Sequence, residues 1–170
     1  MISNTVSTVI LALITPTVLG NFAIYNSGIG GDGISENVDG WQIYELKDGV
    51  PACDDALDWI WRDSDDVSGL KYGVRCSGDG DSCNRSGSGD KIKELEINAR
   101  QYKGDSNRLH FTYYANRGGV IVDTDDKPMG ICEPAPEEQF YCGIKGGRAE
   151  GTRKLNCHSG LWAGNFTQPT

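Results

Sequence analysis

The sequence predicts an α+β domain that consists mostly of an antiparallel β-sheet with one short amphipathic helix and is stabilised by three disulfide bonds. Short segments alternate between apolar and polar side chains, the period-two pattern of half-buried strands. Glycine is abundant, at 23 of 170 residues, and turn sequences such as KDG, GDGD and NRGG separate the segments. The cysteines number six, an even count that fits three bridges in an oxidising compartment.

The chain begins with a segment typical of a secretory signal peptide. Residues 1–20 contain no charged side chain and include an apolar run that is too short to span a bilayer. Val18 and Gly20 stand at positions −3 and −1 of a cleavage before Asn21. A buried N-terminal strand and an uncleaved anchor are the alternatives. We expect a signal peptide at 1–20 and a single secreted, disulfide-stabilised domain at 21–170, with no membrane attachment after cleavage.

Two segments carry the clearest strand pattern. In RLHFTYY, Leu109, Phe111 and Tyr113 face one way and the side chains between them face the other. In LKYGVRC, the apolar side chains share one face in the same manner. In chain order, the predicted strands are Asn21–Asn26, Trp41–Leu46, Leu70–Cys76, Lys93–Ala99, Arg108–Tyr114, Val120–Asp123 and Arg153–Cys157.

The predicted helix lies in PACDDALDWIWRDSDDVSG. We expect two to three helical turns docked on the sheet, because the apolar residues of this segment fall on one arc at the helical period. That arc consists of Cys53, Ala56, Leu57, Ile60 and Trp61.

The acidic tail of the same segment is either a polar turn or a ligand site. Asp63, Asp65 and Asp66 can form Asx-type turns, and with Trp59 beside them they can also form a cation or sugar site. The spacing of an EF-hand calcium loop is not met, because positions five and twelve from Asp63 are valines.

The cysteines allow 15 pairings, and the sequence does not choose among them. Cys76 and Cys83 are close enough to close the GDGDS loop, Cys142 and Cys157 would join neighbouring C-terminal strands, and Cys53 and Cys132 are left as the third pair. The bonds expected on this basis are Cys76–Cys83, Cys142–Cys157 and Cys53–Cys132. A zinc site is not indicated, because the chain has no C-x-x-C pair and two histidines in all, so we expect no metal and no cofactor.

The net charge of −8 is unevenly distributed. Residues 21–90 carry 14 acidic and 5 basic side chains (14 − 5, or −9), and residues 91–170 carry 10 and 11 (+1). The acidic half repels phosphate backbones, so we expect no nucleic-acid partner. The sequons at Asn84 and Asn165 fit surface loops of a secreted glycoprotein.

Catalytic motifs are sparse. Gly28, Gly30 and Gly33 have the G-x-G-x-x-G spacing, but a strand rather than a helix is expected after them, so we interpret them as a long glycine turn and not as a nucleotide site. The best enzyme candidates are Glu94, Glu96 and His110, which stand on the outer faces of two predicted strands. If these strands are neighbours, a carboxylate and an imidazole can serve as general base and acid for a ribonuclease-like or glycosidase-like reaction. Salt links on a sheet surface explain the same residues.

Several blocks resemble a group of small secreted cysteine-containing proteins of filamentous fungi. These blocks are NFAIYNSGIGGDG, PACDDALDWIWRDSDDVSG, KYGVRCSGDGDSC, KELEINA and the final KLNC, and together they span most of the chain from Phe22 to Cys157. The resemblance implies secretion and a fungal origin. It supplies no catalytic residue, and some proteins of this group look like effector candidates at a host surface.

These observations favour a secreted, extracellular fungal protein, an effector candidate, that binds a host protein or a cell-wall polysaccharide as a monomer. The alternative is a small secreted hydrolase that uses Glu94 or Glu96 with His110. A structural wall protein is a third class, for which neither a pocket nor an exposed aromatic patch is expected.

Overall fold

The structure is a computed structural model that describes residues 20–33, 37–56, 60–69, 71–99 and 109–166. The predicted signal peptide, apart from Gly20, and the candidate ligand residue Trp59 lie outside the described residues.

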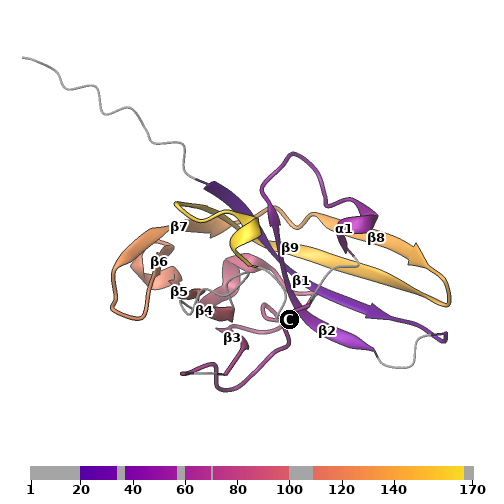
Figure 1. Ribbon diagram of the computed structural model, residues 1–170, viewed down its shortest axis with the longest axis horizontal. Helices are drawn as coiled ribbons and strands as arrows, with labels where there is room; N and C mark the ends of the chain where they lie inside the picture. The colour runs from indigo at the N-terminus through magenta and orange to yellow at the C-terminus, as the bar shows by residue number, and fades with distance from the viewer. Residues whose placement is uncertain (1–19, 34–36, 57–59, 70, 100–108, 167–170) are drawn as a thin grey trace, which may run out of the picture.

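The described chain folds into one antiparallel sheet in the order β2-β1-β9-β7-β6-β5-β4-β3 (Figure 1). The strand β8 pairs with the first half of β9, and β7 pairs with its second half. The mostly antiparallel sheet predicted from the alternating segments is confirmed. The strands are β1 (Gly20–Gly30), β2 (Val38–Glu45), β3 (Gly73–Gly78), β4 (Ile92–Ala99), β5 (Leu109–Tyr114), β6 (Val120–Val122), β7 (Pro128–Pro134), β8 (Gln139–Ile144) and β9 (Gly147–Ser159), and the short helices are α1 (Cys53–Ala56), η1 (Gly89–Lys91), η2 (Ala115–Arg117) and η3 (Ala163–Asn165).

The sheet is a nearly closed barrel, because one short segment links its two outer strands. Trp61 pairs with Trp41 of β2 through two backbone hydrogen bonds of 2.7 Å. Asp63 forms a parallel bridge with Val74 of β3, where the amide of Val74 donates to the carbonyl oxygen of Arg62 at 3.0 Å. We call residues 60–64 the closing segment.

The closing segment corrects the helix prediction. The helix α1 ends at Ala56, and Trp61 lies in a β-bridge instead of on a helical arc. Its side chain is almost fully buried inside the barrel. Pairing the unpaired groups of two sheet edges outweighs the local helical pattern, because an open edge leaves a row of backbone donors and acceptors without partners.

The long strands carry a different core on each face. On β1, Phe22 and Ile24 point into the barrel, whereas Ala23 and Tyr25 point to the outer face. Ala56 of α1 packs against the outer face, so the helix covers the outside of the sheet. We call the buried residues on this face the outer cluster, which consists of Ala23, Tyr25, Ala56, Phe140, Cys142 and Ala149. The barrel interior holds most of the other buried apolar side chains, among them Trp41, Trp61, Leu95, Ile97, Phe111 and Leu155.

The strand prediction at 70–76 is corrected at its start. The strand β3 begins at Gly73, and Tyr72, which was expected on the buried face, is 38% exposed. Val74 is fully buried, as expected, and so are Leu109, Phe111 and Tyr113 of β5 to within a few per cent.

Two of the three expected disulfides are wrong. The bonds are Cys76–Cys83, as expected, together with Cys53–Cys142 and Cys132–Cys157 in place of Cys142–Cys157 and Cys53–Cys132. Cys132 and Cys157 are direct register partners on β7 and β9. Cys142 lies opposite Ala149 on the far part of β9, in the outer cluster, where it meets Cys53 at the start of α1.

Candidate functional site

The predicted catalytic trio does come together on the outside of the barrel. Strands β4 and β5 are neighbours, and His110 Nε2 lies 2.7 Å from Glu96 Oε1. Arg75 of β3 donates from Nε to Glu96 Oε2 at 2.8 Å and from a terminal nitrogen to Glu94. The guanidinium therefore links both carboxylates in a surface ion network. None of these four residues lines the two cavities described below.

The acidic tail 63–66 does not form one site. Asp66 accepts hydrogen bonds from the amide and hydroxyl of Ser68, in the predicted Asx-type turn, and pairs with Lys71. The ammonium of Lys71 and the donors of Ser68 hold the pKa of Asp66 well below its usual range. Asp65 is exposed. Within the part of the chain that the structure describes, no group of three metal-ligating side chains is present.

Asp63, in contrast, lines a cavity. Its carboxylate accepts a 2.6 Å hydrogen bond from the indole Nε1 of Trp41. Although the residue as a whole remains exposed, partial burial of the carboxyl raises its pKa, the Trp41 hydrogen bond opposes that rise, and the negative charge of Asp39 adds to it.

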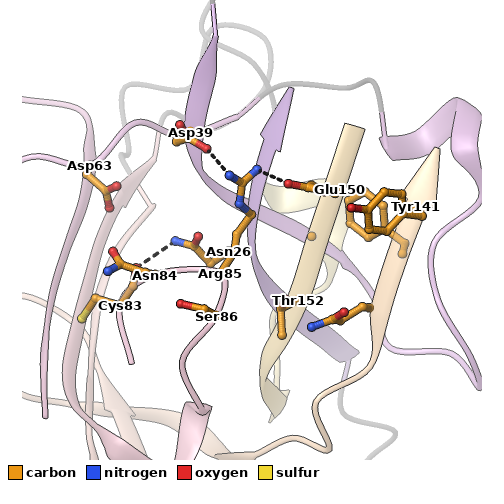
Figure 2. Close-up of a pocket in the computed structure, with 13 residues that line it drawn as sticks. Asn26, Asp39, Asp63, Cys83, Asn84, Arg85, Ser86, Tyr141, Glu150 and Thr152 are labelled. Carbon is orange, nitrogen blue, oxygen red and sulfur yellow. Dashed lines mark hydrogen bonds and ion pairs between the residues drawn. The ribbon is translucent and has the colours of Figure 1, made fainter. Parts of the chain in front are cut away.

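Two adjoining cavities, of about 540 and 750 Å³, form an open groove beside the closing segment. Both are lined by Asp39, Arg85 and Glu150, so these residues stand where the cavities meet (Figure 2). The first cavity is also lined by Asn26, Asp63, Cys83, Asn84, Ser86, Gln139, Phe140, Tyr141, Gly151 and Thr152. The second is lined mainly by the end of β1, the start of β9 and the turns that adjoin them.

Arg85 is the central charge of the groove. Its guanidinium reaches Asp39 Oδ1 at 3.2 Å on one side and Glu150 Oε1 at 3.1 Å on the other, as Figure 2 shows. Glu150 also pairs with Arg148 Nε at 3.0 Å. Gly28 of β1 makes room for this arrangement, because a Cβ there would collide with the side chains of Arg85 and Asp39.

Tyr141 supplies an exposed aromatic ring to the groove. The residue is 65% exposed, and the Arg148 guanidinium lies 5.5 Å from the ring centroid. The hydrogen bond from its hydroxyl to Glu150, and the charge of that carboxylate, raise the pKa of Tyr141. The ring is thus fixed at one edge and remains available to a ligand.

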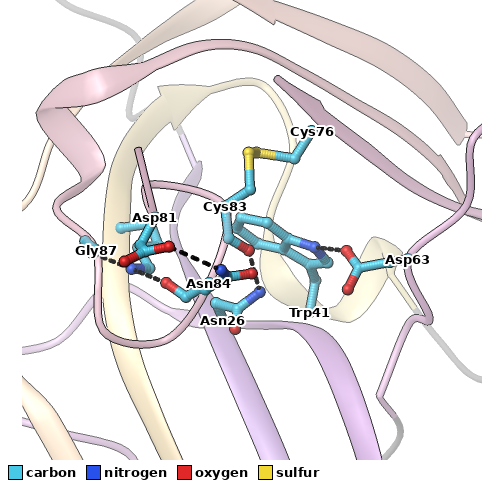
Figure 3. Close-up of a disulfide and its surroundings, with 9 residues drawn as sticks. Asn26, Trp41, Asp63, Cys76, Asp81, Cys83, Asn84 and Gly87 are labelled. Atoms are coloured by element: carbon cyan, nitrogen blue, oxygen red, sulfur yellow. Dashed lines mark hydrogen bonds between the residues drawn. A yellow bond between two sulfur atoms is a disulfide. The ribbon is translucent and has the colours of Figure 1, made fainter. Parts of the chain in front are cut away.

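A rigid loop forms the opposite wall. Cys83 is bonded to Cys76, and its carbonyl oxygen accepts a 3.0 Å hydrogen bond from Asn26 Nδ2 (Figure 3). The ammonium of Lys154, which is fully buried, donates to the carbonyl oxygens of Asn84 at 2.6 Å and of Gly87. A bulge in the β1–β9 register accompanies this lysine.

The sequence analysis does not predict the groove. The prediction that Gly28 and Gly30 belong to a long turn is wrong, because both lie in β1, where the absence of a side chain leaves space for the side chains of Arg85 and Asn37. Glycine inside a strand marks a close approach of another group, and this signal was present in the sequence. The alternation in QFYCGI, which places Tyr141 opposite Phe140, was also present.

The fold and the groove define a disulfide-stabilised antiparallel barrel with an open polar cleft on one side. No protein-family model matches the chain, and no curated protein or solved structure is significantly similar to it. Among the described residues, no helix is long and apolar enough to cross a membrane.

Proposed function

We propose that this protein is a secreted fungal binding protein that acts at the cell exterior, and that its groove receives a segment of cell-wall polysaccharide. The observation that carries the proposal is the exposed ring of Tyr141 in a groove of carboxylate, guanidinium and amide groups. A sugar ring combines an apolar C–H face, which stacks on an aromatic side chain, with hydroxyls that both donate and accept hydrogen bonds.

The three disulfides support the extracellular part of the proposal, because such bonds persist in oxidising compartments. Each of the two cavities of the groove, of about 540 and 750 Å³, is within the range of about 300 to 1,000 Å³ that is usual for ligand sites. The fungal origin and the role as an effector candidate rest on the sequence resemblance alone.

The test is retention of the full mature chain on insoluble chitin, glucan, cellulose and xylan. We expect wild type to be retained on one of them without release of sugar, and Tyr141→Ala to bind about tenfold more weakly, the equivalent of one lost stacking contact of about 1.4 kcal/mol. Tyr141→Phe, which keeps the ring, should bind like wild type.

Tyr72→Ala is the matched control, because Tyr72 is exposed but lines neither cavity. Equal retention of Tyr141→Ala and wild type would show that the polysaccharide does not bind in the groove. No retention on any polysaccharide would shift the assignment to a host-protein partner.

A secreted hydrolase is the second candidate, and the contact between His110 and Glu96 favours it. If RNA cleavage or sugar release is found, His110→Ala should abolish it without loss of folding. Undiminished turnover in that variant would exclude this trio as the catalytic site.

A further inference from the structure

The loop that forms one wall of the groove carries the sequon Asn84-Arg85-Ser86. Asn84 and Ser86 are both exposed and both line the first cavity. The side-chain nitrogen of Asn84 donates a long hydrogen bond of 3.4 Å to Asp81 Oδ1. Because Asn84 is exposed and this contact is long, the folded protein can accommodate a sugar on the side-chain nitrogen.

The sequon also has a fixed position. Arg85, its middle residue, is held between Asp39 and Glu150. The backbone on either side is held by the ammonium of Lys154 and by the disulfide of Cys83. A sugar attached at Asn84 therefore begins at a defined point on the rim of the groove (Figure 2).

We propose that Asn84 carries an N-linked glycan whose first sugars occupy the groove, so that the protein's own glycan competes with external polysaccharide. This rests on the proposed function of the groove. In the modifying step, Asn84 Nδ2 forms a bond to C1 of an oligosaccharide carried on a lipid pyrophosphate; the bond from C1 to the pyrophosphate oxygen breaks, the lipid pyrophosphate leaves, and Nδ2 gives up a proton.

The competition follows from tethering. A ligand held by a short flexible link has an effective concentration of about 1 mM at its site. For a groove that binds the sugar with a Kd of about 0.1 mM, the tethered glycan fills about nine sites in ten. The accessibility of Tyr141 should then fall about tenfold.

The experiment compares two preparations of the same mature chain. One is made in a eukaryotic secretory host behind a foreign leader joined at Asn21, and the other in a bacterial periplasm, where disulfides form and no N-glycan is added. Peptide mapping by mass spectrometry determines whether Asn84 is modified. Nitration by tetranitromethane then measures the accessibility of Tyr141, with Tyr72 as the internal control.

We expect Asn84 to be glycosylated and Tyr141 to nitrate about tenfold more slowly in the eukaryotic preparation, with Tyr72 unchanged. Asn165→Gln, which removes the other sequon, should preserve that protection. An unmodified Asn84, or equal nitration of Tyr141 in both preparations, would overturn the inference. Neither readout uses an external polysaccharide, so the two proposals can fail separately. Protection of Tyr141 without retention of either preparation would count against binding of external polysaccharide. Retention of the bacterial preparation, with equal nitration of Tyr141 in both preparations, would count against occupancy of the groove by the Asn84 glycan.

Discussion

At the scale of single residues, Trp41 connects the barrel core, its closure and the groove. Its side chain is fully buried, its backbone pairs with Trp61, and its indole nitrogen donates to Asp63 at the groove. Asp63 therefore satisfies the polar end of a core side chain, which accounts for a carboxyl at this position without a catalytic role.

We expect Asp63→Ala to lower the free energy of unfolding by about 1 kcal/mol, because the indole N–H of Trp41 loses its acceptor. Asp63→Asn keeps an oxygen acceptor and should remain near wild type, and Asp65→Asn and Asp66→Asn should also change folding little. Urea denaturation measures these differences. Equal stability of Asp63→Ala and Asp63→Asn would show that this hydrogen bond contributes nothing.

Lys154 makes stability depend on pH. Burial lowers its pKa from 10.5 to about 8. Between these values the unfolded chain binds more protons than the folded one, so this residue makes the free energy of unfolding rise as the pH increases from about 8 to 10.5. Burial raises the pKa values of Tyr25 and Tyr113, which act in the opposite direction above pH 10.

The measurement is urea denaturation of wild type and Lys154→Met at several pH values across that interval. The variant should be less stable, because the carbonyl oxygens of Asn84 and Gly87 lose their donor. Subtracting its profile isolates the rise due to the lysine. A difference that does not change with pH would contradict the lowered pKa.

At the scale of secondary-structure elements, the disulfides differ in what they hold. Cys53–Cys142 attaches a helix of four residues, too short to persist alone, to a strand 89 positions away in the sequence. Cys76–Cys83 closes a loop across a separation of 7 and supports the wall of the groove.

Removal of both cysteines of a bond to alanine should therefore cost more for Cys53–Cys142 than for Cys76–Cys83. The chain-entropy relation gives about 4.5 and about 2.5 kcal/mol. Chemical denaturation of the two double variants checks the order. The reverse order would mean that the groove loop contributes more to folding than its short closure suggests.

At the scale of the whole molecule, the barrel core and the outer cluster form one unit. The strands β1 and β9 make the most extensive pairing, and both contribute side chains to the inner and the outer cluster. Neither cluster can lose its packing without disturbing the same two strands.

Tryptophan fluorescence, which reports on Trp41 and Trp61 in the barrel, and far-UV circular dichroism should therefore show coincident unfolding transitions. Two separate transitions would show that the outer layer with α1 unfolds independently of the barrel. Trp162 is 54% exposed, so its emission should change least.

Local patterns determined much of the secondary structure. The alternation in RLHFTYY placed Leu109, Phe111 and Tyr113 inside and His110 outside, as the structure has them. Hydrophobic period decides the buried face of a strand because successive side chains point to opposite sides. The sequence predicts a contact of His110 with Glu96 only if their two strands are neighbours. The strand order of the folded sheet makes β4 and β5 neighbours, and the contact forms.

The sequence by itself determined the alternating strands, the number of cysteines and the sequon beside Cys83. Only the tertiary structure decided that residues 60–64 close the barrel instead of continuing a helix, that Cys53 meets Cys142, and that Arg85 lies between Asp39 and Glu150. The physical reason is range. A side-chain period is a property of neighbouring residues, whereas strand order, edge closure and the groove arise from contacts between distant segments, whose free energies are set by the packing of the whole chain.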